Sequence, residues 1–413
     1  MFKEIKLHRW RQFKNVDISF DDKITVLTGE NGSGKTTILN ILSKHFGWNL
    51  QFISTLLPWL SRKRTKSIFS DVWDVITEDL NVKPGSIEVG TITYFDDQIC
   101  NLMVQPQGDK SQYNPNYSNQ QAVYGLHIPS HQPAVTYHRV SDIPTDPRSI
   151  QQHYQSYNSL LQQYYQPTHA DNPGIALKKS LISLAVFGYG NQAVIENPEY
   201  RSMFEEFQSI LQLLLPKSIG FQRLEIRIPD IVFVTQTGDF PLDSASGGIG
   251  AIVGISWQIF MYQQSNKDNN FVVTFDEPES HLHPSMQREL LPNLSKAFPS
   301  TQFIIATHSP FIVTSSPEAR VFVLVFDEDH HITSEHLETA DLSGTANQTL
   351  REILGVPITV PIWVEDRLSK IVEKYRDKEL TPDLLQQLKQ DMVNNNLGFL
   401  LPEALTSLGR SKS

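Results

Sequence analysis

The sequence predicts an α/β fold in which helices flank a mixed sheet and the N-terminal strands pair antiparallel. Three stretches carry this prediction. The apolar run "KITVLT" leads into a glycine-rich loop at Gly29 and then into a helix. A second buried strand, "NFVVTFDEP", ends in two acids, and a third, "TQFIIATHSP", follows it along the chain. Apolar strands that alternate with helices favour a parallel central sheet.

The first half of the chain contains both strand and helix patterns. Alternating apolar residues in 2–7 and 16–20 predict two half-buried strands, and a helix should follow the glycine loop. From 98 to about 167 the chain is rich in Gln, Tyr, Asn, Ser and Pro, which indicates loops and one polar helix. Two helices are expected between 174 and 215.

The second half returns to the α/β pattern. A strand begins at 221, an apolar helix follows Ile249, and 320–337 should form a hairpin. The tail after Gly355 should be helical, with Thr381 as an N-cap and Pro382 as the first helical residue.

These patterns divide the chain into four expected parts. They are an N-terminal lobe (1–97), a polar insertion with helices (98–219), a C-terminal lobe (220–340) and a helical, partner-binding tail (341–413).

Composition restricts the classes of protein to be considered. The chain has 413 residues, a net charge of -10 and one cysteine, Cys100. The charge argues against a protein that coats nucleic acid along its whole surface. A single cysteine cannot form a disulfide within the chain, which fits a reducing compartment. No apolar run is long enough for a membrane span, so we expect a cytoplasmic protein with no membrane partner.

The glycine-rich loop predicts phosphate binding. Residues 29–36, "GENGSGKT", fit the pattern G-x-x-x-x-G-K-[ST]. Glycines let backbone N–H groups surround a phosphate, and the positive end of the following helix points at the same oxygens. The expected nucleotide-binding residues are Asn31, Gly32, Ser33, Gly34, Lys35, Thr36 and Thr37.

Three further stretches would complete a nucleotide site. Asp276 follows a buried strand and, with Thr36, would hold Mg²⁺, while Glu277 would act as general base. "SASGGIG" places a serine and glycines at a helix start, another place where anions bind. His308 follows the next strand.

In this order, the four stretches resemble those of ABC-type ATPase heads. Gly29 to Thr36 resembles the Walker A loop, Phe271 to Glu277 resembles Walker B, and His308 resembles the switch histidine. Residues 245–249 resemble the signature, although Ala245 and Ile249 depart from its usual ends. The resemblance implies ATP and Mg²⁺ as cofactors, slow regulatory hydrolysis catalysed through Glu277 and His308, and a head-to-tail homodimer or higher oligomer. In that assembly, Ser246, Gly247 and Gly248 would contact the ATP held by a second chain.

The segments before and after these motifs resemble the SMC, RecF and OLD branch of these ATPases. "LHRWRQFKNVDISF" precedes the loop, and "DEPESHLHP" matches a form found in OLD-like defence ATPases. The chain lacks a long coiled-coil pattern, and "WVEDRLSKIVEKY" is a poor match to a Toprim opening.

Without these two features, the chain is most similar to the PtuA ATPases of Septu and retron-associated Septu-like anti-phage systems. That resemblance implies an HNH-type effector nuclease (PtuB-like) as partner and, in some systems, a reverse transcriptase with its RNA–DNA product.

Several alternatives stay open from sequence alone. The chain could be a RecF-like clamp on DNA, a transporter energy subunit, or a protein that holds ATP with little turnover. Direct DNA contact could involve the basic run 61–66 or base stacking on Tyr154, Tyr157, Tyr164 and Tyr165. A glutamine that ligates Mg²⁺ is implied by the family, and the candidates are Gln98, Gln105, Gln107 and Gln132.

Overall fold

The computed structural model describes most of the chain in two compact units. The described residues are 1–53, 86–104, 112–133, 136–145, 150–165, 172–267 and 269–338, followed in the tail by 346, 349, 353, 362–376, 381–395 and 397–410. One unit runs from Met1 to Ala346 and the other from Asn347 to Ser413. The basic run 61–66, Gln105 and Gln107 lie outside the described residues.

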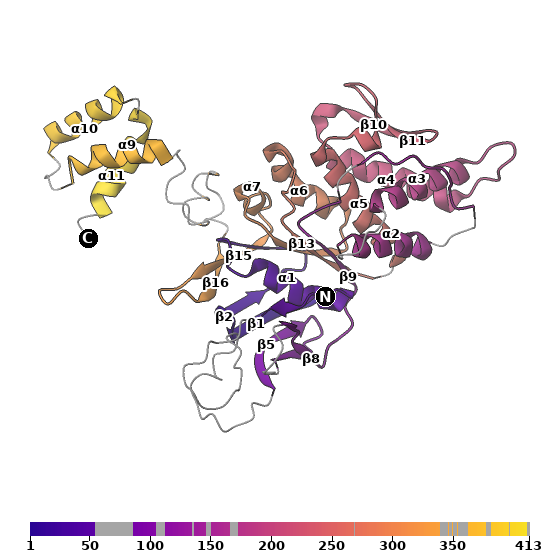
Figure 1. Ribbon diagram of the computed structural model, residues 1–413, viewed down its shortest axis with the longest axis horizontal. Coiled ribbons are helices and arrows are strands. Elements are labelled where there is room, and N and C mark those ends of the chain that lie inside the picture. The colour runs from indigo at the N-terminus through magenta and orange to yellow at the C-terminus, as the bar shows by residue number, and fades with distance from the viewer. Residues whose placement is uncertain are drawn as a thin grey trace, which may run out of the picture. The chain divides into compact units, whose positions relative to one another are not determined.

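An eleven-stranded mixed sheet organises the first unit (Figure 1). Its order is β8 (Asn116–Ser118), β6 (Ile99–Val104), β5 (Ile87–Tyr94), β1 (Phe2–Trp10), β2 (Phe13–Ser19), β16 (Ile332–Leu337), β15 (Arg320–Phe326), β3 (Ile24–Gly29), β14 (Thr301–Ala306), β13 (Phe271–Asp276) and β9 (Gly125–Ile128).

The sheet has an antiparallel part and a parallel part. Strands β8 to β2 pair antiparallel, and the pairing of β1 with β2 agrees with the antiparallel strands expected at the N-terminus. Strands β15, β3, β14, β13 and β9 are all parallel, so their carboxyl ends lie along one edge. Strand β16 joins the two parts, since it pairs antiparallel with β15 and parallel with β2. Ligands of open α/β sheets bind at the carboxyl edge.

Helix α1 (Lys35–Ser43) follows β3 and packs against β3, β13 and β14. Its buried Ile38, Leu39 and Leu42 join a core that includes Phe2 and Trp10 from β1. Burying these apolar side chains fixes the start of α1, and therefore the glycine loop, against the sheet. The short element η1 (Lys44–Phe46) follows α1. Further along the chain, β4 (Phe52–Ile53) pairs antiparallel with β7 (Gln112–Tyr113).

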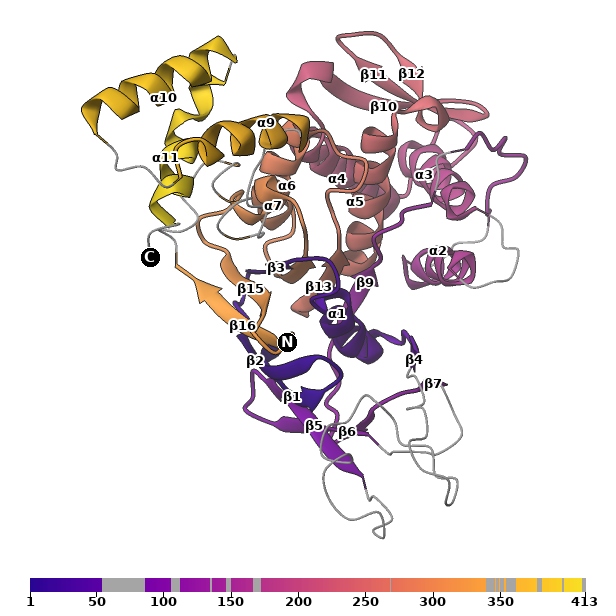
Figure 2. The same cartoon turned by 60° about the vertical axis from the view of Figure 1, so that its left-hand side comes forward.

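A group of helices adjoins the β9 end of the sheet (Figure 2). It contains α2 (Ile150–Tyr164), α3 (Pro173–Tyr189), α4 (Pro198–Leu214) and α5 (Gly247–Ser265). Between α4 and α5, η3 (Lys217–Ile219) leads into the small sheet of β10 (Phe221–Arg227), β11 (Asp230–Thr235) and β12 (Phe240–Pro241), and η4 (Leu242–Ser244) leads into α5. Helices α6 (Pro284–Ala297) and α7 (Pro310–Val313) follow β13 and β14.

The polar segment 98–167 differs from its prediction. It contains the expected polar helix, α2, but the expected loops are wrong for β6, β7, β8 and β9. Strand β6 completes a hairpin with β5, and β9 adds the last parallel strand beside β13. The burial of Cys100, Leu102 and Val104 in β6 supplies the apolar contacts that the polar composition concealed.

The tail forms the second unit, with α9 (Ile362–Glu373), α10 (Pro382–Asn394), η6 (Gly398–Leu400) and α11 (Leu401–Arg410). Its own core includes Leu368, Leu388 and Met392. Thr381 caps α10 by accepting a hydrogen bond from the Leu384 N–H, with Pro382 beginning the helix, as predicted. Among the described residues no helix is both long and apolar enough to cross a membrane.

Candidate nucleotide site

The glycine loop between β3 and α1 adopts a conformation that depends on its glycines. Gly29, Gly32 and Gly34 have positive φ values of 135°, 83° and 88°. A Cβ on Gly29 would lie 2.3 Å from the Leu324 carbonyl oxygen. Gly34 is the N-cap residue of α1, and no side chain caps the helix there. The loop therefore presents backbone at the positive end of a helix, an arrangement suited to an anion.

Lys35 is folded back into this loop. Its Nζ donates to the carbonyl oxygens of Gly29 and Glu30 at 3.0 and 2.9 Å, and lies 3.4 Å from Ser33 Oγ. Burial lowers the pKa of Lys35 to about 8, although the nearby acids Asp276 and Glu277 favour its charged form. The ammonium group therefore lies inside the glycine loop, which is the place where a phosphate would bind.

Thr36 and Asp276 lie together although they are far apart in sequence. The Thr36 hydroxyl donates to the Asp276 carboxylate, with oxygen–oxygen distances of 3.2 and 3.0 Å. Asp276 ends β13 and is only 7% exposed. Burial raises its pKa to about 6, and the Thr36 bond opposes that rise. A hydroxyl and a carboxylate are oxygen ligands of the kind that Mg²⁺ prefers, so this pair fits the predicted metal site.

Glu277 and His308 extend the site along the carboxyl edge. Glu277 has a positive φ of 47°, and its N–H donates to the Ala306 carbonyl at 2.8 Å. A non-glycine residue in this region is strained, and such strain is often found at functional positions. His308 Nε2 lies 3.8 Å from Glu277 Oε1. Burial, together with the charge of Lys35, lowers the pKa of His308, which favours a neutral imidazole at neutral pH.

Glu279 has a role that the sequence pattern did not reveal. Its Oε1 accepts hydrogen bonds from the Thr307 hydroxyl at 2.7 Å and from the backbone N–H groups of His308 and Ser309 at 2.9 and 3.2 Å. Burial raises its pKa. Glu279 therefore ties the turn after β13 to the turn after β14, and this fixes the backbone that carries His308. The sequence signal was its place in "DEPESHLHP", which marked a family resemblance but assigned Glu279 no role.

The signature-like stretch lies at the start of α5. Ser246 is the N-cap residue, and its side chain makes no capping bond. Gly247 and Gly248 form the first turn, where a Cβ on Gly248 would lie 3.0 Å from the His281 carbonyl oxygen. Within the described part of the chain, no hydrogen bond or ion pair joins these three residues to the glycine loop. They therefore differ from Lys35, Thr36, Asp276, Glu277 and His308, which lie together.

Topology distinguishes the candidate glutamines. Gln132 follows β9, whose last residue, Ile128, pairs with Phe275 of β13. It therefore leaves the sheet at the edge where Asp276 lies. Its Oε1 accepts from Gln258 Nε2 at 3.0 Å and its Nε2 donates to the Pro129 carbonyl at 2.8 Å. Gln98, in contrast, lies in the turn between β5 and β6.

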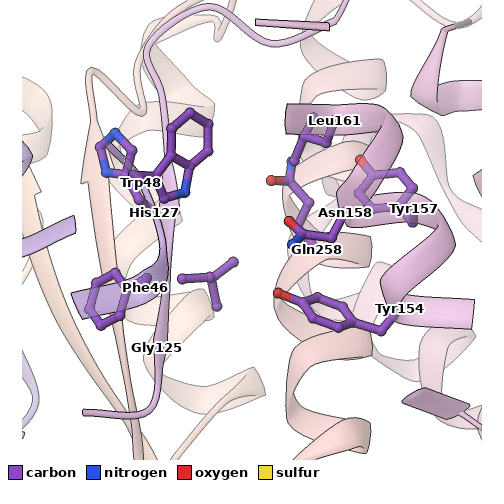
Figure 3. Close-up of a pocket in the computed structure, with 10 residues that line it drawn as sticks. Phe46, Trp48, Gly125, His127, Tyr154, Tyr157, Asn158, Leu161 and Gln258 are labelled. Atoms are coloured by element: carbon purple, nitrogen blue, oxygen red, sulfur yellow. The ribbon is translucent and has the colours of Figure 1, made fainter. Parts of the chain in front are cut away.

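A small polar pocket beside β9 is lined by two of the four tyrosines considered for base stacking. Figure 3 shows two sides facing each other, one from β9 and the chain after α1, the other from α2 and α5. The lining includes Trp48, His127, Tyr154, Tyr157 and Gln258. Tyr157 is buried, Tyr154 packs on Tyr262 at 5.5 Å, and the Tyr165 hydroxyl donates to the His131 carbonyl. These rings pack inside the protein; Tyr164 is 39% exposed.

Comparison with known proteins supports the resemblance expected from the sequence. A family model described as an AAA ATPase domain matches residues 148–313, and one described as an AAA domain matches residues 4–49. The first range contains Ser246 to Gly248, Asp276, Glu277 and His308, and the second contains the glycine loop.

Relatives of known type are also ATPases or proteins of defence systems. The chain is 21% identical to the Septu protein PtuA of Bacillus thuringiensis, over 99% of both chains. It is 33% identical to the Septu protein PtuA of Bacillus mycoides (strain KBAB4), over 21% of this chain and 13% of that protein. It is 27% identical to the retron Ec83 probable ATPase of Escherichia coli, over 30% of this chain and 19% of that protein. The expected similarity to PtuA and retron ATPases is confirmed.

Among solved structures, an SMC head domain from Thermotoga maritima aligns with a TM-score of 0.44 and 16% identity, over 82% of this chain and 99% of that chain.

Proposed function

We propose that this chain binds and hydrolyses ATP with Mg²⁺, dimerises head-to-tail around the nucleotide, and controls a separate effector nuclease in anti-phage defence. One observation carries the enzymatic part of this proposal. Three segments distant in sequence bring Lys35, Thr36, Asp276, Glu277 and His308 together at the carboxyl edge of the parallel strands.

The loop accounts for phosphate binding. When ATP binds, Lys35 would exchange its bonds to the Gly29 and Glu30 carbonyls for bonds to phosphate oxygens. The backbone N–H groups at the start of α1 would face the same phosphates. Mg²⁺, held through Thr36 and Asp276, would supply charge neutralisation at the phosphate oxygens.

Hydrolysis would depend on Glu277 as the base that accepts a proton from the attacking water. Its left-handed backbone turns it away from the course of β13. His308, 3.8 Å away, is close enough to orient this carboxylate. Glu279 would keep His308 in that position through its bonds to the following turn.

The position of the signature-like stretch supports the proposed dimerisation. Ser246 and Gly247 are exposed, and Ser246 makes no cap of its own helix. The start of α5 is therefore available to contact ATP bound to a second chain. A head-to-tail pair would supply both sites symmetrically.

The nuclease part of the proposal rests on the relatives. The similarity to PtuA extends along both chains and supports placing this chain with the ATPases of Septu systems. The similarity to a retron ATPase supports the same association. We expect an HNH-type nuclease as partner and, in retron-associated systems, a reverse transcriptase with its RNA–DNA product. The tail, which forms its own compact unit, is a natural place for partner contact.

Glu277→Gln tests the enzymatic proposal. The substitution keeps size and hydrogen bonding but removes the base, so turnover should fall by about 10²–10⁴-fold while ATP affinity stays near that of wild type. ATP should then hold the variant as a dimer in sedimentation velocity. Wild-type protein that binds no ATP, or equal turnover in both proteins, would refute the proposal.

Tagged wild type and Glu277→Gln, purified from the native host in ATP, test the partner proposal. Mass spectrometry should identify a small HNH protein, with or without a reverse transcriptase. Recovery of DNA or DNA-repair proteins alone would instead support a RecF-like clamp.

A further inference from the structure

Lys178 is a buried cation outside the nucleotide site. It lies on α3, and its side chain is 2% exposed. Its Nζ contacts Asp243 Oδ2 at 2.5 Å and Asp230 Oδ1 at 3.1 Å, and donates to the His138 carbonyl oxygen at 2.8 Å. All three donor positions of the ammonium group are therefore matched by oxygen acceptors.

These acceptors come from three separate segments. Asp243 lies in η4, the single turn that leads directly into Ser246 and α5. His138 belongs to the segment that follows Gln132, and Asp230 begins β11. The His138 N–H also approaches Asp243 Oδ2, at 3.4 Å. Lys178 thus joins the turn before the signature to the segment that leaves the carboxyl edge of the sheet.

Burying the Lys178 ammonium group contributes little to the stability of the fold. A buried cation loses its hydration, and its attraction to carboxylates restores little more than that loss. Such a group does, however, impose a defined geometry, because displacing any of its acceptors leaves a buried donor of the ammonium group without a hydrogen bond. The neighbouring Lys179 provides a contrast, since it pairs with Asp142, whose side chain is 69% exposed.

We propose that Lys178 is a positioning residue for the signature. By holding Asp243 against α3 and the His138 segment, it fixes η4 and so places Ser246, Gly247 and Gly248 for contact with ATP on a second chain. This inference rests on the proposed function, because the signature acts only if two heads close on ATP. Lys178 would affect turnover and dimerisation without affecting the nucleotide-binding loop of its own chain.

Lys178→Met, with Lys179→Met as matched control, separates this role from general support of the fold. For Lys178→Met, kcat and ATP-driven dimerisation should fall by about 10- to 100-fold, since small misplacements at a reacting site have effects of that size. The Kd for a fluorescent ATP analogue should stay within about twofold of wild type, because Lys35 and its loop are untouched. Lys179→Met should match wild type in both respects, as exposed ion pairs contribute little.

Mixing variants tests whether the defect acts between chains. A mixed dimer of Lys178→Met and Lys35→Ala would hold one site with an intact loop from the first chain and an intact signature from the second. Turnover in the mixture should therefore exceed that of either variant alone and match a calibrating mixture of Ser246→Arg with Lys35→Ala. A calibrating mixture that recovers turnover while the Lys178→Met mixture does not would overturn the proposal.

Other outcomes also decide the question. Unchanged kcat in Lys178→Met overturns the proposal, and so does loss of ATP affinity in parallel with kcat. If Lys178→Met fails to fold, Asp243→Asn, which keeps the side-chain shape, is compared with Asp142→Asn, and a selective fall in kcat is again required. Failure of wild type to bind ATP would instead refute the proposed function itself.

Discussion

Two residues of the candidate site have pKa values close to physiological pH. Burial raises the pKa of Asp276 to about 6 and lowers that of Lys35 to about 8. Each side chain is therefore held in a place where its charged form is disfavoured until a ligand of opposite charge arrives. Perturbations of this kind are concentrated at functional sites, although structural groups show them too.

We predict a bell-shaped pH dependence of kcat/KM for ATP hydrolysis. Activity should rise through a pKa near 6, because Asp276 must lose its proton to hold Mg²⁺, and fall through a pKa near 8 as Lys35 loses its charge. The kcat/KM profile reports groups of the free enzyme. Steady-state rates at fixed ionic strength measure both limbs.

Raising Mg²⁺ provides an internal control for this assignment. The metal competes with the proton on Asp276, so the acid limb should move to lower pH while the alkaline limb stays in place. A profile that is flat between pH 5.5 and 8.5 would contradict both assignments.

At the scale of elements, the glycine loop is shaped by a contact from another strand. The backbone of Gly34 lies against the ring of Phe13 in β2, where a Cβ would be 2.4 Å from the ring. Gly32 has a similar φ, yet a Cβ there would meet no atom within 4 Å. Substituting each glycine in turn therefore distinguishes the free-energy cost of backbone strain from that of a steric clash with Phe13.

We predict that Gly34→Ala weakens ATP binding much more than Gly32→Ala. Both substitutions incur about 1–2 kcal/mol of left-handed strain, but only Gly34→Ala must also displace the Phe13 ring or the loop, at a further cost of about 1–3 kcal/mol. Calorimetric ATP titration and chemical denaturation measure the two effects. The double variant Phe13→Ala/Gly34→Ala should recover part of the lost affinity, and equal losses for the two glycine variants would disprove the argument.

Elements with a strong local pattern could be predicted, whereas those defined by distant partners could not. Helix α5 and the first strand of the β15–β16 hairpin were predicted from continuous apolar runs in their own sequence. Strand β9 has four residues, includes Gly125 and His127, and pairs with β13 almost 150 residues later. The residues next to β9 in sequence therefore give no indication of its partner strand. The position of Gln132 at the edge of the sheet was unpredictable for the same reason.

At the scale of the whole molecule, the tail has a core of its own. Leu388 and Met392 on α10 are fully buried among side chains of α9, η6 and α11. The first unit, which contains the nucleotide site, ends at Ala346. Each unit therefore contains the apolar burial on which its own stability depends.

We predict that Leu388→Ala loosens the tail without changing ATP affinity. Removing a buried leucine costs about 2–5 kcal/mol, so hydrogen exchange should accelerate in α9 to α11 while α1 and β13 stay protected. Leu385→Ala on the same helix is the control, because Leu385 is 41% exposed and its loss should cost no more than about 0.5 kcal/mol. A matching loss of ATP affinity in Leu388→Ala would show that the two units are not independent.

Local sequence was enough to predict which residues form the candidate site. The glycine loop, the acids after β13 and His308 are local patterns, because a phosphate-binding turn or the end of a buried strand is encoded by adjacent residues. Which residues contact one another, in contrast, depends on how distant segments pack together. The Thr36–Asp276 pair, the Glu279 bonds to the His308 turn and the Lys178–Asp243 contact each join separate segments. The residues of each pair are brought together by the order of the strands and by the packing of α3. Neither can be predicted from residues adjacent in sequence.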